Sequence, residues 1–166
     1  GLKWPNDLVV DEPSAAPGEP SVRKLGGVLA ESIVTGDRLD AVVVGIGLNV
    51  NWPDELPEDL ARIATSLRHV TGGAVDRVAL AARLLTGFER RLEDLDHAEG
   101  RRRTVADYAA RCVTVGQSVR VELAGGELRG RVEAVADDGG LVLVDDAGVR
   151  HDVTVGDVTH LRPVDG

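Results

Sequence analysis

The spacing of apolar residues changes once along this chain of 166 residues, and this change limits the possible folds more than any other feature. Over residues 57–112 apolar positions recur with the period of an amphipathic helix. From residue 113 onward apolar and polar residues alternate, and turn signals separate the runs. We therefore predict an α/β (α+β) domain with a mixed sheet and helices over residues 1–112. A small β-barrel domain over residues 113–166 is expected to follow it.

Short apolar runs in the first 50 residues predict strands. The runs are Leu8–Val10, Val28–Ile33 and Ala41–Gly47, of which the last is rich in valine and is typical of a buried strand. Between the first two runs lies the segment Asp11–Val22, which contains Pro13, Pro17 and Pro20. Because proline and glycine exclude regular structure there, we expect a mobile surface insertion.

Helical spacing predicts three helices between residues 57 and 112. The first carries an apolar stripe and is ended by Thr71–Gly73, and the second begins after an N-cap at Asp76 and stops at Gly100. A third helix places Cys112 on its apolar stripe as a small buried core residue. The stripes consist of Leu60, Ile63, Ala64 and Leu67 in the first helix, Ala81, Leu84, Leu85, Phe88, Leu92 and Leu95 in the second, and Val105, Tyr108, Ala109 and Cys112 in the third.

Five short strands are predicted after residue 113, and five strands of this length are typical of a small barrel. This segment holds more acidic than basic residues and no Phe, Trp or Tyr. Without a basic groove or stacking rings, it is a poor candidate for nucleic-acid binding. The predicted strands are 118–123, 128–135, 141–144, 149–155 and 158–161.

Charge and cysteine content exclude several classes of protein. The 19 Lys and Arg residues against 28 Asp and Glu give a formal net charge of −9, which disfavours generic binding to nucleic acid or to anionic membranes. No apolar run is long enough to span a membrane, and one cysteine forms neither an internal disulfide nor a thiolate metal site. The four His residues lack ligand-like spacing, so no metal site is predicted and the expected location is the cytoplasm.

Only two of the basic residues are lysines, Lys3 and Lys24, and both lie in the first quarter of the chain. A lysine is a compact point charge on a slim stem and can meet a phosphate or carboxylate in a narrow pocket. Lys24 precedes Gly26 and Gly27, which would let an anion approach the backbone closely, although these glycines taken alone are better explained by a turn that needs glycine before a strand.

Three further polar residues are candidates for the same site. Asp7 is a candidate base or charge partner, and Asn6 offers a donor and an acceptor suited to an adenine edge, although both also suit a self-capping turn. Asn49 follows the glycine-rich run Gly45–Gly47 at the end of a strand. That run is not a dinucleotide fingerprint, because Val50 stands where the third small residue belongs and no helix signal follows.

Three segments, taken together and in this order, resemble biotin protein ligases. They are Lys3-Trp4-Pro5-Asn6-Asp7, Lys24-Leu25-Gly26-Gly27-Val28-Leu29-Ala30-Glu31 and Gly45-Ile46-Gly47-Leu48-Asn49-Val50-Asn51. The resemblance continues through Ala64-Thr65-Ser66-Leu67 to the last predicted strand, and so covers essentially the whole chain. It implies the C-terminal part of a biotin/lipoate ligase-type catalytic domain followed by an SH3-like barrel.

The resemblance also implies an activity and a role for each candidate residue. Such a ligase activates biotin with ATP to biotinyl-5′-AMP and transfers biotin to a lysine of a biotin carboxyl carrier protein or acetyl-CoA carboxylase subunit. Lys24 would contact the biotin carboxylate and the phosphate, and Asp7 would assist deprotonation of the carrier lysine. Gly26 and Gly27 would let the ligand lie on the backbone, and Asn6 and Asn49 would hold the nucleotide. Mg²⁺ would enter with ATP, and Glu31 is one carboxylate that could contribute to binding it.

Two alternatives stay open at this stage. One is a lipoate or octanoate ligase of the same superfamily, and the other is a non-catalytic module that binds a carrier domain. The Gly/Arg-rich loop that covers biotin in the family lies upstream of the Lys3–Asp7 segment and is not in this sequence, so we expect the chain alone to be inactive and marginally stable. Nothing in these residues resembles the DNA-binding helix-turn-helix that a co-repressor would need.

Overall fold

The computed structural model describes residues 1–11, 22–123, 126–154 and 157–160, and its contacts divide the chain into two compact units. Unit 1 comprises Gly1 and Asn6–Ala81, and unit 2 comprises Leu2–Pro5 and Ala82–Gly166. Most of the predicted insertion, residues 12–21, lies outside the described residues. The domain boundary predicted after residue 112 stays a prediction.

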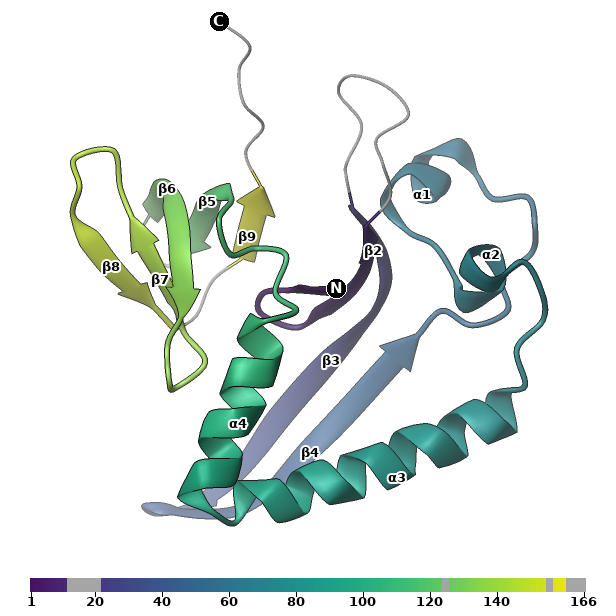
Figure 1. Ribbon diagram of the computed structural model, residues 1–166, viewed down its shortest axis with the longest axis horizontal. Helices are drawn as coiled ribbons and strands as arrows, with labels where there is room; N and C mark the ends of the chain where they lie inside the picture. The colour runs from purple at the N-terminus through teal and green to yellow at the C-terminus, as the bar shows by residue number, and fades with distance from the viewer. Residues whose placement is uncertain (12–21, 124–125, 155–156, 161–166) are drawn as a thin grey trace, which may run out of the picture. The chain divides into compact units, whose positions relative to one another are not determined.

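Unit 1 is built on three antiparallel strands, β2 (Asp7–Asp11), β3 (Val22–Thr35) and β4 (Arg38–Leu48) (Figure 1). β3 and β4 form a long hairpin that turns at Gly36, whose φ of 60° suits glycine. The expected strands are confirmed, but β2, β3 and β4 are not a mixed sheet. Parallel pairing here is limited to an isolated bridge between Lys24 and Ala64.

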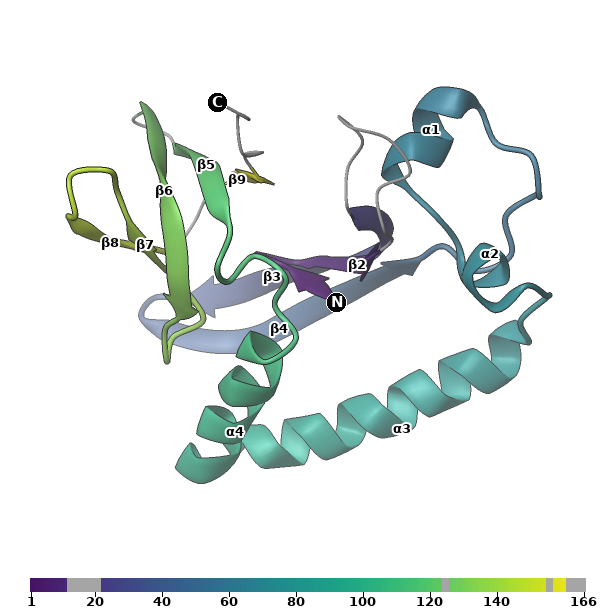
Figure 2. The same ribbon diagram turned by 45° about the horizontal axis from the view of Figure 1, so that its top comes forward.

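The prediction that Ala41–Gly47 is a buried strand is wrong for this chain. Every residue of that run is exposed, and residues 29–35 of the facing strand are exposed as well, with Leu29 at 61%. Valines on both faces of a strand allow burial from both sides, but burial also needs two covering layers. Figure 2 shows β3 and β4 side by side as a long hairpin. Among its described residues, the apolar side chains between residues 29 and 46 are exposed, with Val42 at 51% and Val43 at 55%.

The single helix predicted around Leu60–Leu67 is two short helices, α1 (Glu58–Ile63) and α2 (Leu67–Thr71). The chain between them is extended at Ala64 and Ser66. The Thr65 N–H donates to the Lys24 carbonyl at 2.9 Å, so tertiary pairing with β3 interrupts the helical pattern. The predicted end is confirmed, because Gly72 closes α2 in the left-handed conformation.

Helix α3 (Arg77–Leu95) begins where its sequence predicted. The Asp76 Oδ1 accepts hydrogen bonds from the Val78 and Ala79 N–H groups at 2.8 and 3.1 Å, so Asp76 is the N-cap. The apolar stripe of α3 is largely exposed, and no residue of this helix is buried. The spacing of apolar residues therefore predicted the helix correctly, but the apolar stripe of α3 is not buried in a core.

The second predicted helix does not stop at Gly100. α3 ends at Leu95, and Gly100 is a buried residue inside α4 (Ala98–Ala109). A Cβ atom at Gly100 would lie 1.9 Å from the Asp94 carbonyl oxygen, so this glycine permits the tight turn between the helices. Cys112 lies beyond the end of α4 and is buried, which confirms its expected core position.

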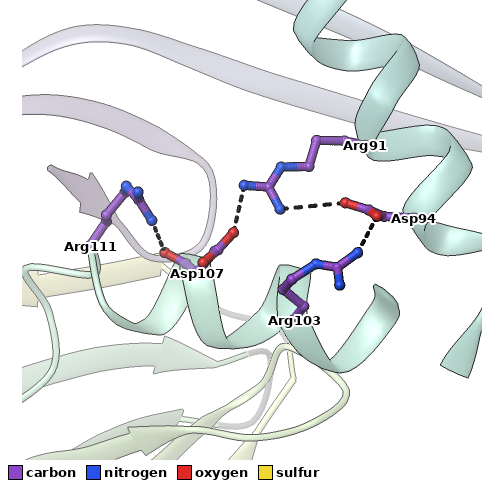
Figure 3. Close-up of polar contacts among 5 residues, drawn as sticks. All are labelled: Arg91, Asp94, Arg103, Asp107 and Arg111. Atoms are coloured by element: carbon purple, nitrogen blue, oxygen red, sulfur yellow. Dashed lines mark hydrogen bonds and ion pairs between the residues drawn. The ribbon is translucent and has the colours of Figure 1, made fainter. Parts of the chain in front are cut away.

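Charged side chains join the C-terminal half of α3 to α4 (Figure 3). The Arg91 Nη2 donates to Asp107 Oδ2 at 2.6 Å, and Asp94 accepts from Arg103 of the facing helix. The Arg111 guanidinium donates to the Asp107 carbonyl oxygen at 2.8 Å. The hydrogen bond from Arg91 lowers the pKa of the Asp107 carboxyl group. These contacts couple the two helices at a partly exposed surface.

Unit 2 also contains a five-stranded antiparallel sheet in the order β8-β7-β6-β5-β9. Its fully buried side chains include Val119, Val121, Val132, Leu141 and Leu143, which form one core. The five strands predicted from the two-residue period are therefore confirmed where the structure describes them. Their bounds are β5 Ser118–Leu123, β6 Gly126–Val135, β7 Leu141–Val144, β8 Arg150–Val153 and β9 Asp157–His160.

The N-terminal residues Leu2–Pro5 belong to unit 2. Strand β1 (Leu2–Lys3) forms a parallel bridge from Leu2 to Cys112, and Trp4 is 3% exposed within the sheet core. The burial of Tyr108, which packs against the same core, raises the pKa of its hydroxyl group. No local pattern predicts that Trp4 packs among strands more than one hundred residues away.

We predict that Gly100→Ala lowers the free energy of unfolding by about 1–3 kcal/mol, since the new methyl group has no room beside Asp94. Gly87→Ala in α3 is the matched control, because nothing lies within 4 Å of a Cβ there. Alanine favours a helix by up to about 1 kcal/mol over glycine, so this control should gain stability. Urea unfolding measures both, and equal effects would contradict the tight turn.

We predict that Asp107→Asn destabilises the protein at pH 6 and has no effect at strongly acid pH. The lowered pKa of Asp107 means that its ion pair stabilises the fold above the ordinary carboxyl pKa of about 3.9. This contribution is lost as the pH falls through the lowered value. Urea midpoints of both forms between pH 6 and 2 measure the difference, with Asp59→Asn as a control on exposed α1. A difference that is constant with pH would contradict the assignment.

Candidate functional site

The three sequence segments singled out above meet at one end of β2, β3 and β4. Lys24 Nζ lies 2.5 Å from Asp7 Oδ1, with the lysine side chain 51% exposed. Lys24 lines two cavities, of about 430 and 640 Å³, and Asp7 lines the smaller one. Gly27 and Gly47 also lie in the walls of both cavities.

Strand register brings Lys24 and Asp7 together across the long connection between them. Asp11 pairs with Val22 at one end of the strand pair, and Asp7 pairs with Gly27 at the other. A shift in register between Leu8 and Val9 places Lys24 opposite Val9. The number of residues inserted between Asp11 and Val22 therefore does not separate the two charged side chains.

Gly26 and Gly27 lie inside β3, so the turn considered for them before the strand is wrong. Gly26 is buried, and a Cβ atom there would lie 2.4 Å from the Gly47 carbonyl oxygen of β4. A Cβ atom at Gly27 would meet Asp7 Oδ1 at 3.3 Å and Lys24 Nζ at 3.5 Å. Gly26 therefore permits close strand approach, whereas Gly27 leaves space beside the ion pair.

Both candidate asparagines lie on the cavities, and both use their amide nitrogen to hold the backbone. The Asn6 Nδ2 donates to the Val28 carbonyl at 2.7 Å. The Asn49 Nδ2 donates to the Thr65 carbonyl at 3.0 Å and to the Lys24 carbonyl at 3.4 Å. Asn49 thus connects the end of β4, the Lys24 strand and the extended segment after α1.

The larger cavity has an apolar wall that the sequence analysis missed. This wall is formed by Trp52, Leu60, Ile63 and Ala64, which come from the segment after β4 and from α1. Three of these residues, Leu60, Ile63 and Ala64, were assigned to the apolar stripe of a predicted helix. The available signal was Trp52 itself, an exceptional residue in a chain with 2% aromatic content, placed three residues after Asn49.

The described residues contain no group of three or more His, Cys, Asp or Glu side chains that could hold a metal ion. Glu31, considered above for Mg²⁺, is an exposed residue of β3 opposite Val43 of β4. These donors do not fit a metal site, so no step is derived through one. In the part of the chain that the structure describes, no helix is both long and apolar enough to cross a membrane.

The geometry defines a class of site. An exposed ammonium group stands beside a carboxylate over a backbone floor without Cβ atoms, and an apolar wall closes one side. Such a site accommodates a small molecule that has an anionic group and an apolar or ring portion. The fold is an α/β unit with this site, joined to a five-stranded sheet unit.

Comparison with known proteins shows that this chain is similar to biotin protein ligases. Residues 114–161 match the family described as the biotin protein ligase C terminal domain. Over 162 residues the chain is 40% identical to the biotin--acetyl-CoA-carboxylase ligase of Mycobacterium tuberculosis, covering 98% of this chain and 53% of that protein. It is 29% identical over 150 residues to the bifunctional ligase/repressor BirA of Bacillus subtilis, covering 90% of this chain and 43% of BirA.

The solved structures agree with the sequence relatives. The biotin protein ligase from Aquifex aeolicus in complex with biotin and ATP superposes with a TM-score of 0.73 at 27% identity, covering 97% of this chain and 61% of that one. The chain thus spans about half the length of the curated relatives it matches. The resemblance predicted from the three segments is confirmed, including the SH3-like C-terminal fold.

We predict that Gly26→Ala lowers the free energy of unfolding by about 1–3 kcal/mol, because the methyl group would meet the Gly47 carbonyl. Gly45→Ala is the matched control on the same strand pair, where the nearest atom to a Cβ is the Leu29 carbonyl oxygen at an ordinary 3.8 Å. Thermal and urea unfolding measure both variants. Equal stability of Gly26→Ala and the unsubstituted chain would contradict the close approach of β3 and β4.

Proposed function

We propose that this chain provides part of a biotin protein ligase. In the first step the biotin carboxylate attacks the α-phosphate of ATP, forming biotinyl-5′-AMP and releasing pyrophosphate. In the second, a lysine amine of a biotin carboxyl carrier protein or acetyl-CoA carboxylase subunit attacks the acyl carbon and releases AMP. The observation that carries this proposal is the convergence of the three ligase-like segments on Lys24.

Lys24 is the residue to which we assign charge stabilisation. Biotin carboxylate and ATP repel each other, and an ammonium group between them reduces that repulsion and stabilises the charge that develops on the transferring phosphate. The half-exposed Lys24 Nζ has three donor hydrogens, so it can keep Asp7 as a partner and still bind an incoming anion. Gly27 supports this role because its missing side chain leaves room beside Nζ.

Asp7 is the residue to which we assign assistance in deprotonating the carrier lysine. A lysine amine must lose a proton to act as a nucleophile, and a carboxylate within hydrogen-bond reach can accept it. Asp7 lies on the smaller cavity beside Lys24, where an acyl group bound by Lys24 would be attacked. Its carboxylate also keeps the lysine oriented before substrate binds.

The two asparagines are assigned to the nucleotide through their remaining polar atoms. The amide nitrogens of Asn6 and Asn49 donate to backbone carbonyls, which orients their Oδ1 atoms. An Oδ1 atom can accept a hydrogen bond from the adenine amino group or a ribose hydroxyl. Gly26 and Gly27 form the floor on which the ligand would lie.

The proposed reaction also needs Mg²⁺ and a place where its substrates meet. Mg²⁺ would arrive with ATP, and no residue of this chain is assigned to it. The protein would act in the cytoplasm, where ATP and carrier proteins meet. Two other functions are kept as outcomes of the test: a lipoate or octanoate ligase, and a carrier-binding module without catalysis.

The experiment is ATP–pyrophosphate exchange, with biotin and separately with lipoate and octanoate. It is run on this chain and on the same chain extended by any residues that precede it in its own reading frame, which we call the longer protein. We expect exchange with biotin, and only in the longer protein. Exchange with lipoate or octanoate instead would favour the related ligase. If a folded longer protein exchanges with none of the acids but binds a carrier domain, the carrier-binding module replaces this proposal.

We predict that Lys24→Ala in the longer protein lowers exchange by at least about 100-fold, the usual cost of removing one group that stabilises transition-state charge. Arg38→Ala is the matched control, because it also removes an exposed cation paired with an aspartate on the same hairpin, with Arg38 Nη2 2.6 Å from Asp40 Oδ1. The control should exchange at the normal rate. Unchanged exchange in Lys24→Ala would exclude the assigned role.

A further inference from the structure

We infer that Arg23 is a positioning residue that holds the apolar wall of the larger cavity in place relative to Lys24. The inference rests on the proposed ligase function, in which Asn49 on the same cavity holds the nucleotide. Arg23 lines neither of the two cavities beside Lys24. It acts through α1, the helix that supplies Leu60 and Ile63 of the wall.

Two consecutive residues of β3 take up the hydrogen bond that would have continued α1. In a longer α-helix the Thr65 N–H would donate to the Ala61 carbonyl, four residues earlier. In this chain the Thr65 N–H donates to the Lys24 carbonyl at 2.9 Å. The Ala61 carbonyl accepts from the Arg23 guanidinium, with Nη1 at 3.2 Å. Arg23 and Lys24 thus satisfy both groups that the end of this helix leaves without a helical partner.

These two hydrogen bonds join α1 to β3 at points four residues apart, Ala61 and Thr65. One hydrogen bond would leave the end of the helix free to rotate about it, whereas two fix both its distance and its direction. The positive guanidinium also suits the negative end of a helix. The wall residues Leu60, Ile63 and Ala64 lie within this anchored turn or next to it.

A third hydrogen bond connects the same turn to the residue assigned to the nucleotide. The Asn49 Nδ2 donates to the Thr65 carbonyl at 3.0 Å. Thr65 is fully buried, so water does not compete for its two backbone hydrogen bonds. Because Asn49 lines the same cavity as the wall, the position of α1 sets the separation between a polar edge and an apolar surface.

This separation matters for a ligand that has a ring. A ring that packs on the wall and bonds to Asn49 requires both at a fixed distance. Lys24 is held separately, by the pairing of β2 with β3 and by its ion pair with Asp7. Loss of the Arg23 contact should therefore weaken nucleotide binding and leave the charge stabilisation by Lys24 intact.

The alternative is that Arg23 only stabilises unit 1. This alternative predicts that a substitution affects both substrates equally and that its effect does not depend on the wall. Arg62→Ala is the matched control, because it also removes an arginine that donates a hydrogen bond at α1. The Arg62 Nη2 donates to Asp59 Oδ1 of the same helix at 2.5 Å, and this bond does not join α1 to β3.

Amide hydrogen exchange at Thr65, measured by NMR on the longer protein, tests the anchoring without any activity. Arg23→Met keeps a long side chain and removes the guanidinium. We expect it to accelerate exchange at Thr65 by about three- to tenfold, the range for losing one hydrogen bond, because α1 then separates from β3 more often. Arg62→Ala should leave the rate unchanged. An unchanged rate in Arg23→Met, or equal acceleration in both variants, overturns the inference. Arg23→Gln, whose side chain is shorter, decides the question if Arg23→Met fails to fold.

Kinetics of ATP–pyrophosphate exchange in the longer protein test the consequence for the substrates. We expect Arg23→Met to raise KM for ATP by about three- to tenfold, while KM for biotin and kcat stay within about twofold. The effect on KM for ATP should shrink when Ile63→Ala has already removed part of the wall, since contacts that act through one another are not additive. Equal rises in both KM values, or additive effects with Ile63→Ala, would overturn the positioning role.

Failure of the proposed function gives a different result. In that case the unsubstituted longer protein shows no biotin-dependent exchange of pyrophosphate. Hydrogen exchange at Thr65 would still decide whether Arg23 anchors α1.

Discussion

The close approach of β3 and β4 at Gly26 and Gly47 is the constraint on which the site depends. The space between these strands holds no side chain at Gly26, and the Gly47 carbonyl occupies the position that a Cβ would need. The register of β3 with β4 places Asn49 beside the Lys24 carbonyl, and the register of β3 with β2 places Asp7 beside Lys24. Strand β3 thus pairs on both of its sides, and these two pairings position the ammonium group, its carboxylate partner and the amide that secures the strand ends.

The charged pair is useful because it is accessible. A half-exposed ion pair contributes little to stability, since water screens it and side-chain ordering opposes it. Its position beside a cavity and a glycine floor therefore suits it to binding a ligand. The apolar wall from Trp52 to Ala64 adds a surface suited to a ring or aliphatic chain, which fits the two substrates proposed for a ligase.

The structure also explains why the Lys3–Asp7 segment contains two kinds of residue. Trp4 is a core residue of unit 2, whereas Asn6 and Asp7 belong to the site of unit 1. A core residue of one unit and residues of the candidate site of the other thus lie within four consecutive positions.

Sequence alone determined the element types and nominated several residues that line the candidate site, because period, capping and residue chemistry are local properties. It predicted the Asp76 cap, the five C-terminal strands and the candidates Lys24, Asp7 and Asn49. Only tertiary structure decided where helices break and what is buried. Pairing of Thr65 with Lys24 interrupts a helical stripe, Gly100 is required by a neighbouring helix, and the valine-rich β4 stays exposed. Each of these outcomes depends on contacts between residues that are distant in sequence, and the periodicity of a local segment contains no information about such contacts.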